Sequence, residues 1–180
     1  MRKALLAGTV ALAAAGLTLT GSPAEATSVT FSLTGGSLAV TQPSATATLT
    51  GGGIAGLAGT ALTGALGSTT VNDTRGGITG WTSTIAQTTA LSNGTTTIPV
   101  GNTKAWVAGA IVPTGVAVVT SGTYVSQATG LALTGSAQNF VTATAVVGVN
   151  SASFDPQIAV TIPSDATAGT YSGVITQTVS

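Results

Sequence analysis

Alternation of β-branched and small residues, with few helix-forming segments, is the feature that most constrains this chain of 180 residues. In the run 141–148, Val and Ala occupy the odd positions, whereas Thr, Val and Gly occupy the even ones. A period of two places successive side chains on opposite faces of a strand. Segments rich in Glu, Lys, Arg or Leu with a period near 3.6, which favour helices, are absent after the first residues. The sequence therefore predicts an all-β fold.

Turn residues divide the chain into short strands. Asn93-Gly94 is a hairpin dipeptide, Gly76-Gly77 permits a tight reversal, and Pro163-Ser164-Asp165 forms a turn. We expect Pro113 to end its strand and Pro156 to make an edge or a bulge. Short strands at a spacing of roughly 8–12 residues are typical of an antiparallel β-sandwich. The expected strands cover 28–33, 37–41, 45–50, 61–66, the two sides of the 69–85 corner, 95–100, 104–112, 116–120, 123–127, 139–149, 153–162 and 171–179.

The N-terminus has the pattern of a secretory signal peptide. Met1-Arg2-Lys3 is positively charged, residues 4–19 are mostly apolar, and Ala24-Glu25-Ala26 is a small-residue cleavage site. Glycines and threonines make this run too mild for a membrane span, which needs roughly 20 strongly apolar residues. We expect residues 1–26 to be removed and residues 27–180 to form a single domain. No later segment is apolar enough to span a membrane, so the mature protein is expected to be secreted, extracellular or cell-wall-associated.

Few charges remain after removal of the signal. The basic residues are Arg75 and Lys104 and the acidic residues are Asp73, Asp155 and Asp165, which gives a net side-chain charge of −1. No basic surface exists to attract phosphate groups, so nucleic acid is excluded as a partner. The chain contains no cysteine, so its stability must come from the hydrophobic core and the strand ladders rather than from disulfides.

The stretch 69–85 combines two of these charges with an indole. Asp73 and Arg75 are two residues apart and point to the same face of an extended segment, where they can pair or bind backbone. Gly80 precedes Trp81, which is expected to be buried at the start of the next strand. A corner that joins the two layers of the sandwich is the favoured interpretation. The alternative is a ligand site, because an arginine beside an indole can bind a glycan carboxylate.

The other large side chains permit the same two interpretations. Trp106 lies on one face of its expected strand with Ala108 and Ala110. Core packing is favoured for both Trp81 and Trp106 over an exposed platform for stacking sugars. Tyr171 is interpreted as a core or corner residue at the start of the last strand.

The composition offers few side chains that could carry out catalysis. The chain has no His and no Cys, which removes the common nucleophile–base pairs and the commonest ligands of transition metals. A glycosidase pair formed by Asp155 with another Asp is the remaining enzymatic alternative. No loop has the clustered carboxylates of a calcium site. We therefore predict no enzyme activity, no cofactor and no metal.

Two stretches together resemble a known family. They are similar to motifs of the WxL-like domains of Gram-positive surface proteins. The first stretch is Val71-Asn72-Asp73-Thr74-Arg75-Gly76, followed by Gly80-Trp81. The second is Ile162-Pro163-x-Asp165-x-x-Ala168-Gly169-Thr170-Tyr171-x-Gly173-x-Ile175. The resemblance extends over nearly all of residues 27–180. The tryptophan-any-leucine signature itself departs from the family, because Ser83 replaces Leu after Trp81 and the second signature falls at Gln177-Thr178-Val179 without a tryptophan.

The resemblance implies an immunoglobulin-like antiparallel β-sandwich and non-covalent attachment to peptidoglycan. We therefore expect a secreted, non-enzymatic, structural or binding protein of the cell surface or cell wall, whose partners are peptidoglycan or other cell-surface proteins. The alternative is a self-assembling subunit of a surface layer or fibre, in which uncharged edge strands pair into homo-oligomers.

Overall fold

The computed structural model describes residues 30–42, 46–50 and 58–180. The described residues from Thr34 to Ser180 form a compact unit. Residues 30–33 form no strand, and both Phe31 and Leu33 are exposed, so the strand expected at 28–33 is wrong where it can be compared. Residues 28 and 29, and the signal peptide expected over 1–26, lie outside the described residues.

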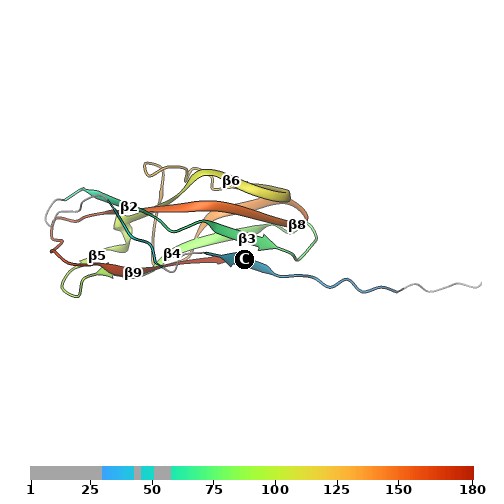
Figure 1. The fold of residues 1–180 in the computed structure, drawn as a ribbon, viewed down its shortest axis with the longest axis horizontal. Helices are drawn as coiled ribbons and strands as arrows, with labels where there is room; N and C mark the ends of the chain where they lie inside the picture. The colour runs from blue at the N-terminus through green and yellow to red at the C-terminus, as the bar shows by residue number, and fades with distance from the viewer. Residues whose placement is uncertain (1–29, 43–45, 51–57) are drawn as a thin grey trace, which may run out of the picture. The chain divides into compact units, whose positions relative to one another are not determined.

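The compact unit is all-β and antiparallel (Figure 1). Its described strands are β1 (Leu38–Thr41), β2 (Ala61–Ala65), β3 (Thr69–Asp73), β4 (Trp81–Ser92), β5 (Thr97–Ile98), β6 (Thr103–Thr120), β7 (Leu131–Ala132), β8 (Gln138–Thr161) and β9 (Ser172–Val179), with a 3-10 turn at Val100–Asn102. They form one nearly closed sheet in which β1, β3, β8, β4 and β5 are neighbours in that order. On the remaining edges β9 pairs with β4, β2 and β6 pair with β8, and β7 pairs with β6.

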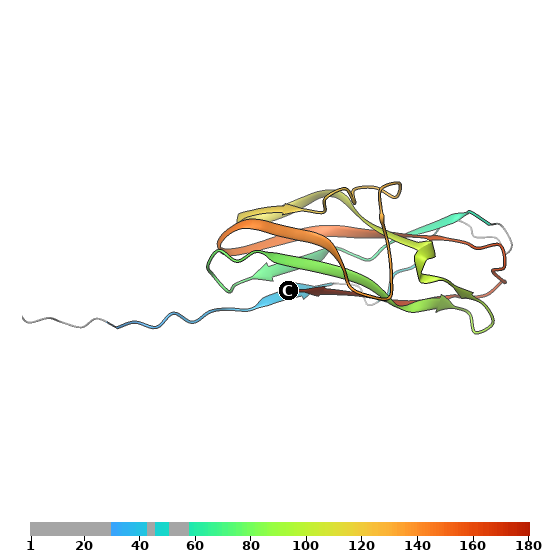
Figure 2. The same cartoon turned by 180° about the vertical axis from the view of Figure 1, so that it is seen from behind.

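Strand β8 organises this sheet. Its N-terminal half pairs with β4, and its C-terminal half pairs with β3 and β2, while β6 follows it on the other edge. Between the halves the backbone bends at Ala145 and Gly148, which adopt positive φ of 50° and 71°. Figure 2 shows β8 curving around this end of the sheet. Val141 from one half and Phe154 from the other therefore reach the same hydrophobic core.

The bend explains why the alternation in this run changes face. Val141 and Ala143 are buried, as expected for one face, but Val147 is exposed and Val146 is buried instead. A residue with positive φ reverses the direction of the side chains that follow it in a strand. The single period of two that the sequence suggests is thus interrupted at Ala145.

Pro113 does not end its strand, because β6 continues through it, so the strands expected at 104–112 and 116–120 are one. Strand β8 runs without a break from Gln138 to Thr161, so the strands expected at 139–149 and 153–162 are also one, and Pro156 lies inside it opposite the gap between β2 and β3. The carbonyl of Pro156 accepts from the amide of Leu66 at 2.9 Å. The missing N–H of Pro156 therefore points to the gap between β2 and β3, because both backbone groups of a strand residue face the same edge. Pro113 lies within β6, on an edge strand just after a register shift, where a missing donor is tolerated.

Three shorter expectations also need correction. Residues 123–127 form turns and no strand; Tyr124 from this loop packs on Phe140, with ring centroids 6.4 Å apart. The strand expected at 95–100 is reduced to β5. In the range 45–50, position 45 lies outside the described residues and only Thr50 forms a bridge, with Thr63. The hairpin at Asn93-Gly94 is confirmed, because the amide of Asn93 donates to the carbonyl of Thr96 and Gly94 has positive φ.

Candidate functional site

The corner between β3 and β4 contains a network of four side chains. Arg75 donates to Asp73 through both Nε and a terminal nitrogen, at 2.9 and 3.0 Å, and the same terminal nitrogen donates to the carbonyl of Gly80 at 3.1 Å. Asn150 donates to the second oxygen of Asp73 at 3.4 Å and accepts from the indole nitrogen of Trp81 at 2.9 Å. The loop turns at Gly76 and Gly77, as expected. Residues from β3, β4 and β8 are thus joined at the bend of β8.

Burial makes Asp73 a fixed part of this network. The carboxylate is 2% exposed, and the guanidinium of Arg75 reaches it from a side chain that is about one third exposed. The hydrogen bonds from the Arg75 side chain hold the pKa of Asp73 below its usual value against the opposing effect of burial, and the carboxylate raises the pKa of Arg75 in return. Both carboxylate oxygens are occupied. Asp73 is therefore an ion pair and backbone clasp, the favoured interpretation of the sequence.

Trp81 and Gly80 serve the same corner. Trp81 is 2% exposed, so its indole is an interior group and offers no face to a sugar. A Cβ on Gly80 would lie 2.3 Å from the carbonyl oxygen of Ala143 on β8. Only glycine allows β4 to begin this close to β8, which brings Trp81 within reach of Asn150.

Asn150 belongs to the network but was not among the residues predicted from sequence. It is 4% exposed and also donates to the carbonyl of Gly148 at 3.3 Å, across the bend. The available signal was a single amide at the end of the apolar run 146–149. A buried polar side chain in such a run must find partners.

Trp106 does not share the core face of its strand. Ala105 and Val107 are buried in the core, whereas Trp106 is half-buried on the opposite face of β6, across from Gln157 of β8. The favoured placement of Trp106, Ala108 and Ala110 toward the core is thus wrong. The mistake arises because Ala and Val are as compatible with the interior as an indole, so the alternation alone does not decide which face is inside.

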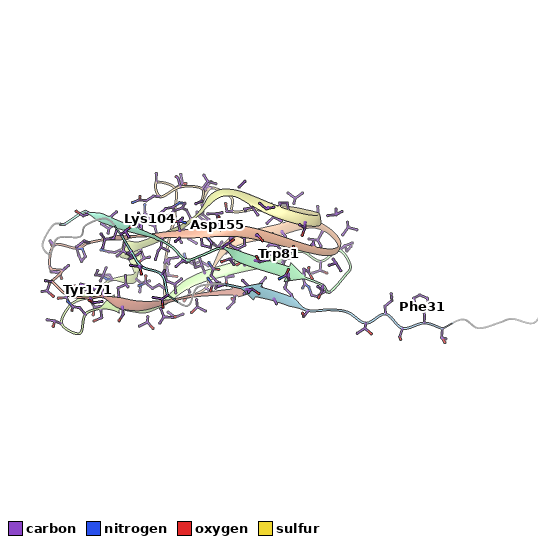
Figure 3. The ribbon with its side chains drawn as sticks, in the orientation of Figure 1. Phe31, Trp81, Lys104, Asp155 and Tyr171 are labelled. Atoms are coloured by element: carbon purple, nitrogen blue, oxygen red, sulfur yellow. The ribbon has the colours of Figure 1, made fainter. Side chains whose placement is uncertain are left out.

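Tyr171 is a corner residue. It is half-buried just before β9, and its hydroxyl donates to the carbonyl of Thr167 at 2.9 Å, which closes the turn that leads into the last strand. Thr167 in turn accepts from the side chain of Asn93 at 3.0 Å. Figure 3 places Tyr171 toward the opposite end of the fold from Trp81, so these two predicted site residues are not brought together.

A shallow cleft on the outer face of β6 and β8 is a second candidate site that the sequence did not reveal. Its volume is about 540 Å³, and its walls are Lys104, Ser126, Gln127, Ala128, Ala159 and Thr161. Lys104 is exposed, and no ion pair joins it to any acid within the part of the chain that the structure describes. The cleft therefore offers one ammonium, two hydroxyls and a carboxamide beside two methyl groups. These groups suit a ligand with hydroxyl, amide and carboxylate functions.

Within 30–42, 46–50 and 58–180, no three His, Cys, Asp or Glu residues lie close enough together to hold a metal ion. The same residues form no helix that is long and apolar enough to cross a membrane. No protein-family model, curated protein or solved structure matches this chain. The role of each site residue is therefore inferred from its contacts and its burial.

Proposed function

We propose that this protein is a secreted, non-enzymatic component of the bacterial cell surface with an immunoglobulin-like β-sandwich fold, and that it binds peptidoglycan non-covalently. The signal-like residues 1–26 and the similarity of the two motifs to WxL-like domains support export and surface location. The internal use of the Asp73–Arg75–Asn150–Trp81 network supports a structural corner. The carboxylate of Asp73 is paired with Arg75 and hydrogen-bonded through both oxygens within the protein, which supports a structural rather than an acid–base role.

The observation that carries the binding half of the proposal is the Lys104 cleft. Peptidoglycan presents sugar hydroxyls, amides and free carboxylates, which match the ammonium, hydroxyls and carboxamide of the cleft walls. An ammonium without an internal acid partner forms a charge-assisted hydrogen bond to a carboxylate at little cost. Trp106 lies two residues from Lys104 on the same face of β6, so its half-buried ring can line the approach of a bound glycan.

The test is retention of the processed protein on purified peptidoglycan at physiological salt. We expect retention of the wild type and an approximately tenfold weaker affinity for Lys104→Ala, which corresponds to about 1.4 kcal/mol. Asp155→Asn changes a charge on the exposed face of the same sheet outside the cleft, and it is the matched control. Absence of wild-type retention would contradict wall binding, and equal binding by Lys104→Ala would remove the cleft from the proposal.

A further inference from the structure

Strand β6 has an unpaired edge along its C-terminal part. One edge of β6 pairs with β8 along its length, with shifts in register. The other edge pairs with β7 at Lys104 and Ala105, the carbonyl of Thr103 accepts from the amide of Leu133, and the amide of Val107 donates to the carbonyl of Tyr124. In the described residues, no further backbone hydrogen bond reaches that outer edge. Figures 1 and 2 both show β6 at the margin of the fold. The final residues, Val116–Thr120, which we name the β6 edge, therefore present unpaired N–H and C=O groups.

The β6 edge lacks two of the devices that usually block pairing, namely charged side chains and proline. Natural edges carry charged side chains, prolines or bulges that prevent a second strand from adding. The register between β6 and β8 shifts between Ala108 and Val112, between Thr114 and Val116, and between Val116 and Val118, and it is regular from Val118 to Thr120. Residues 114–120 contain no charge and no proline. Val and Thr at these positions favour an extended conformation. The regular end of the β6 edge, Val118–Thr120, is thus free to accept another strand.

Exposed apolar side chains flank this edge. Val116 and Val118 are 58% and 59% exposed, and Val147, directly opposite Val116 on β8, is 57% exposed. Val149 and Ile78 extend the apolar surface around the bend of β8, where the amide of Gly148 donates to the carbonyl of Gly77. A soluble monomer rarely leaves such a contiguous group of large apolar side chains in water. A partner that adds a strand at the β6 edge would cover part of it.

We propose that the partner is a second copy of this chain, whose β6 edge pairs antiparallel with the first about a two-fold axis. A two-fold axis places a segment against itself, so any charge in that segment would face an identical charge. The β6 edge is uncharged, and the charge of Arg75 in its surroundings is neutralised by the ion pair with Asp73. The regular part of the β6 edge, Val118–Thr120, is short and gives a shared ladder only about 10 Å long at roughly 3.4 Å per residue. The dimer is accordingly weak and forms at high protein concentration.

Light scattering after size-exclusion chromatography tests the proposal on the processed protein. We expect the wild type to change from monomer to dimer as concentration rises, and Val116→Lys with Val118→Lys to raise the dissociation constant at least tenfold, because like charges then meet across the axis. Val125→Lys places the same charge at an equally exposed valine outside the β6 edge, 60% exposed, and should dimerise like the wild type. The proposal would be overturned if the wild type stays monomeric at millimolar concentration, or if Val125→Lys weakens dimerisation as much as Val116→Lys with Val118→Lys does.

A covalent test does not depend on how the lysine variants fold. The natural chain has no cysteine, so a single cysteine at Val116, Val118 or Thr120 can form a disulfide only between copies. We expect rapid oxidation to a dimer for at least one of these variants and not for Val125→Cys; equal slow oxidation of all four would exclude the pairing. Lys104→Ala should dimerise normally, so a failure of peptidoglycan binding would leave the dimer proposal standing. In the same way, a failure of dimerisation would leave the peptidoglycan proposal standing.

Discussion

The indole nitrogen of Trp81 donates a hydrogen bond to the side-chain oxygen of Asn150, 69 residues later in the chain. Trp81 begins β4, and Asn150 lies in β8 just after its bend. The same amide also donates to Asp73 at the end of β3. One side chain thus fixes the positions of three strands where the sheet turns around the core.

Replacing Asn150 with alanine should lower the free energy of unfolding by about 2–3 kcal/mol, because a buried indole N–H and a buried carboxylate each lose a partner. Denaturant unfolding measures this directly. Asn139→Ala removes the same side chain from an exposed position of the same strand and should change stability by less than about 0.5 kcal/mol. Equal effects at the two positions would contradict a structural role for the network.

The ion pair between Asp73 and Arg75 makes stability depend on pH. The folded-state pKa of Asp73 lies below the unfolded value of about 3.9, so its contribution is present above that value and is lost as the pH falls through the folded pKa. Asp73→Asn should therefore cost about 1–2 kcal/mol near neutral pH and progressively less in acid.

Urea unfolding of both proteins between pH 2 and 7 checks this expectation. Asp155→Asn is the control, because Asp155 is exposed and has no ion pair within the residues described; the acid slope of that variant should equal that of the wild type. A constant difference between the wild type and Asp73→Asn across the whole pH range would show that the charge of Asp73 contributes nothing to folding.

Local chemistry explains which parts of this fold could be predicted from the sequence. The all-β class, the Asn93-Gly94 hairpin, the pairing of Asp73 with Arg75 and the burial of Trp81 all follow from residues close together in the chain. The WxL-like resemblance, the signal peptide and the immunoglobulin-like topology remain predictions.

Long-range partners explain the rest. Pro156 was expected to make an edge or a bulge, and its missing N–H is accommodated by the break between β2 and β3 on the neighbouring edge of β8. The inward face of β6 depends on what β8 places opposite it, so Trp106 was assigned to the wrong side. Asn150 joined the corner only because β8 bends at Ala145 and Gly148. None of these partners is local in sequence.

Close approach of two backbones makes Gly80 irreplaceable. Gly80→Ala should destabilise the fold by about 1–3 kcal/mol, because the new methyl group meets the carbonyl of Ala143, which is part of β8 and cannot move away easily. Thermal unfolding provides the measurement. Gly101→Ala is the matched control, since a Cβ there meets no atom within 4 Å, and this variant should be neutral or slightly stabilising. A tolerated Gly80→Ala would mean that β4 and β8 can separate at no cost.

Buried hydroxyls at two neighbouring positions should respond in opposite directions to removal. The Ser83 hydroxyl is buried without a hydrogen-bond partner, whereas Thr69 donates to Gln177 at 3.2 Å, where the Gln177 amide nitrogen is itself unpartnered. Ser83→Ala removes a desolvated polar group and should raise the free energy of unfolding by about 1 kcal/mol. Thr69→Val keeps the shape of the side chain but leaves the side-chain oxygen of Gln177 without a hydrogen-bond donor, which should lower the free energy of unfolding by about 1–2 kcal/mol. Chemical denaturation of both variants decides the point. Destabilisation by Ser83→Ala would contradict the expectation for an unpartnered buried hydroxyl.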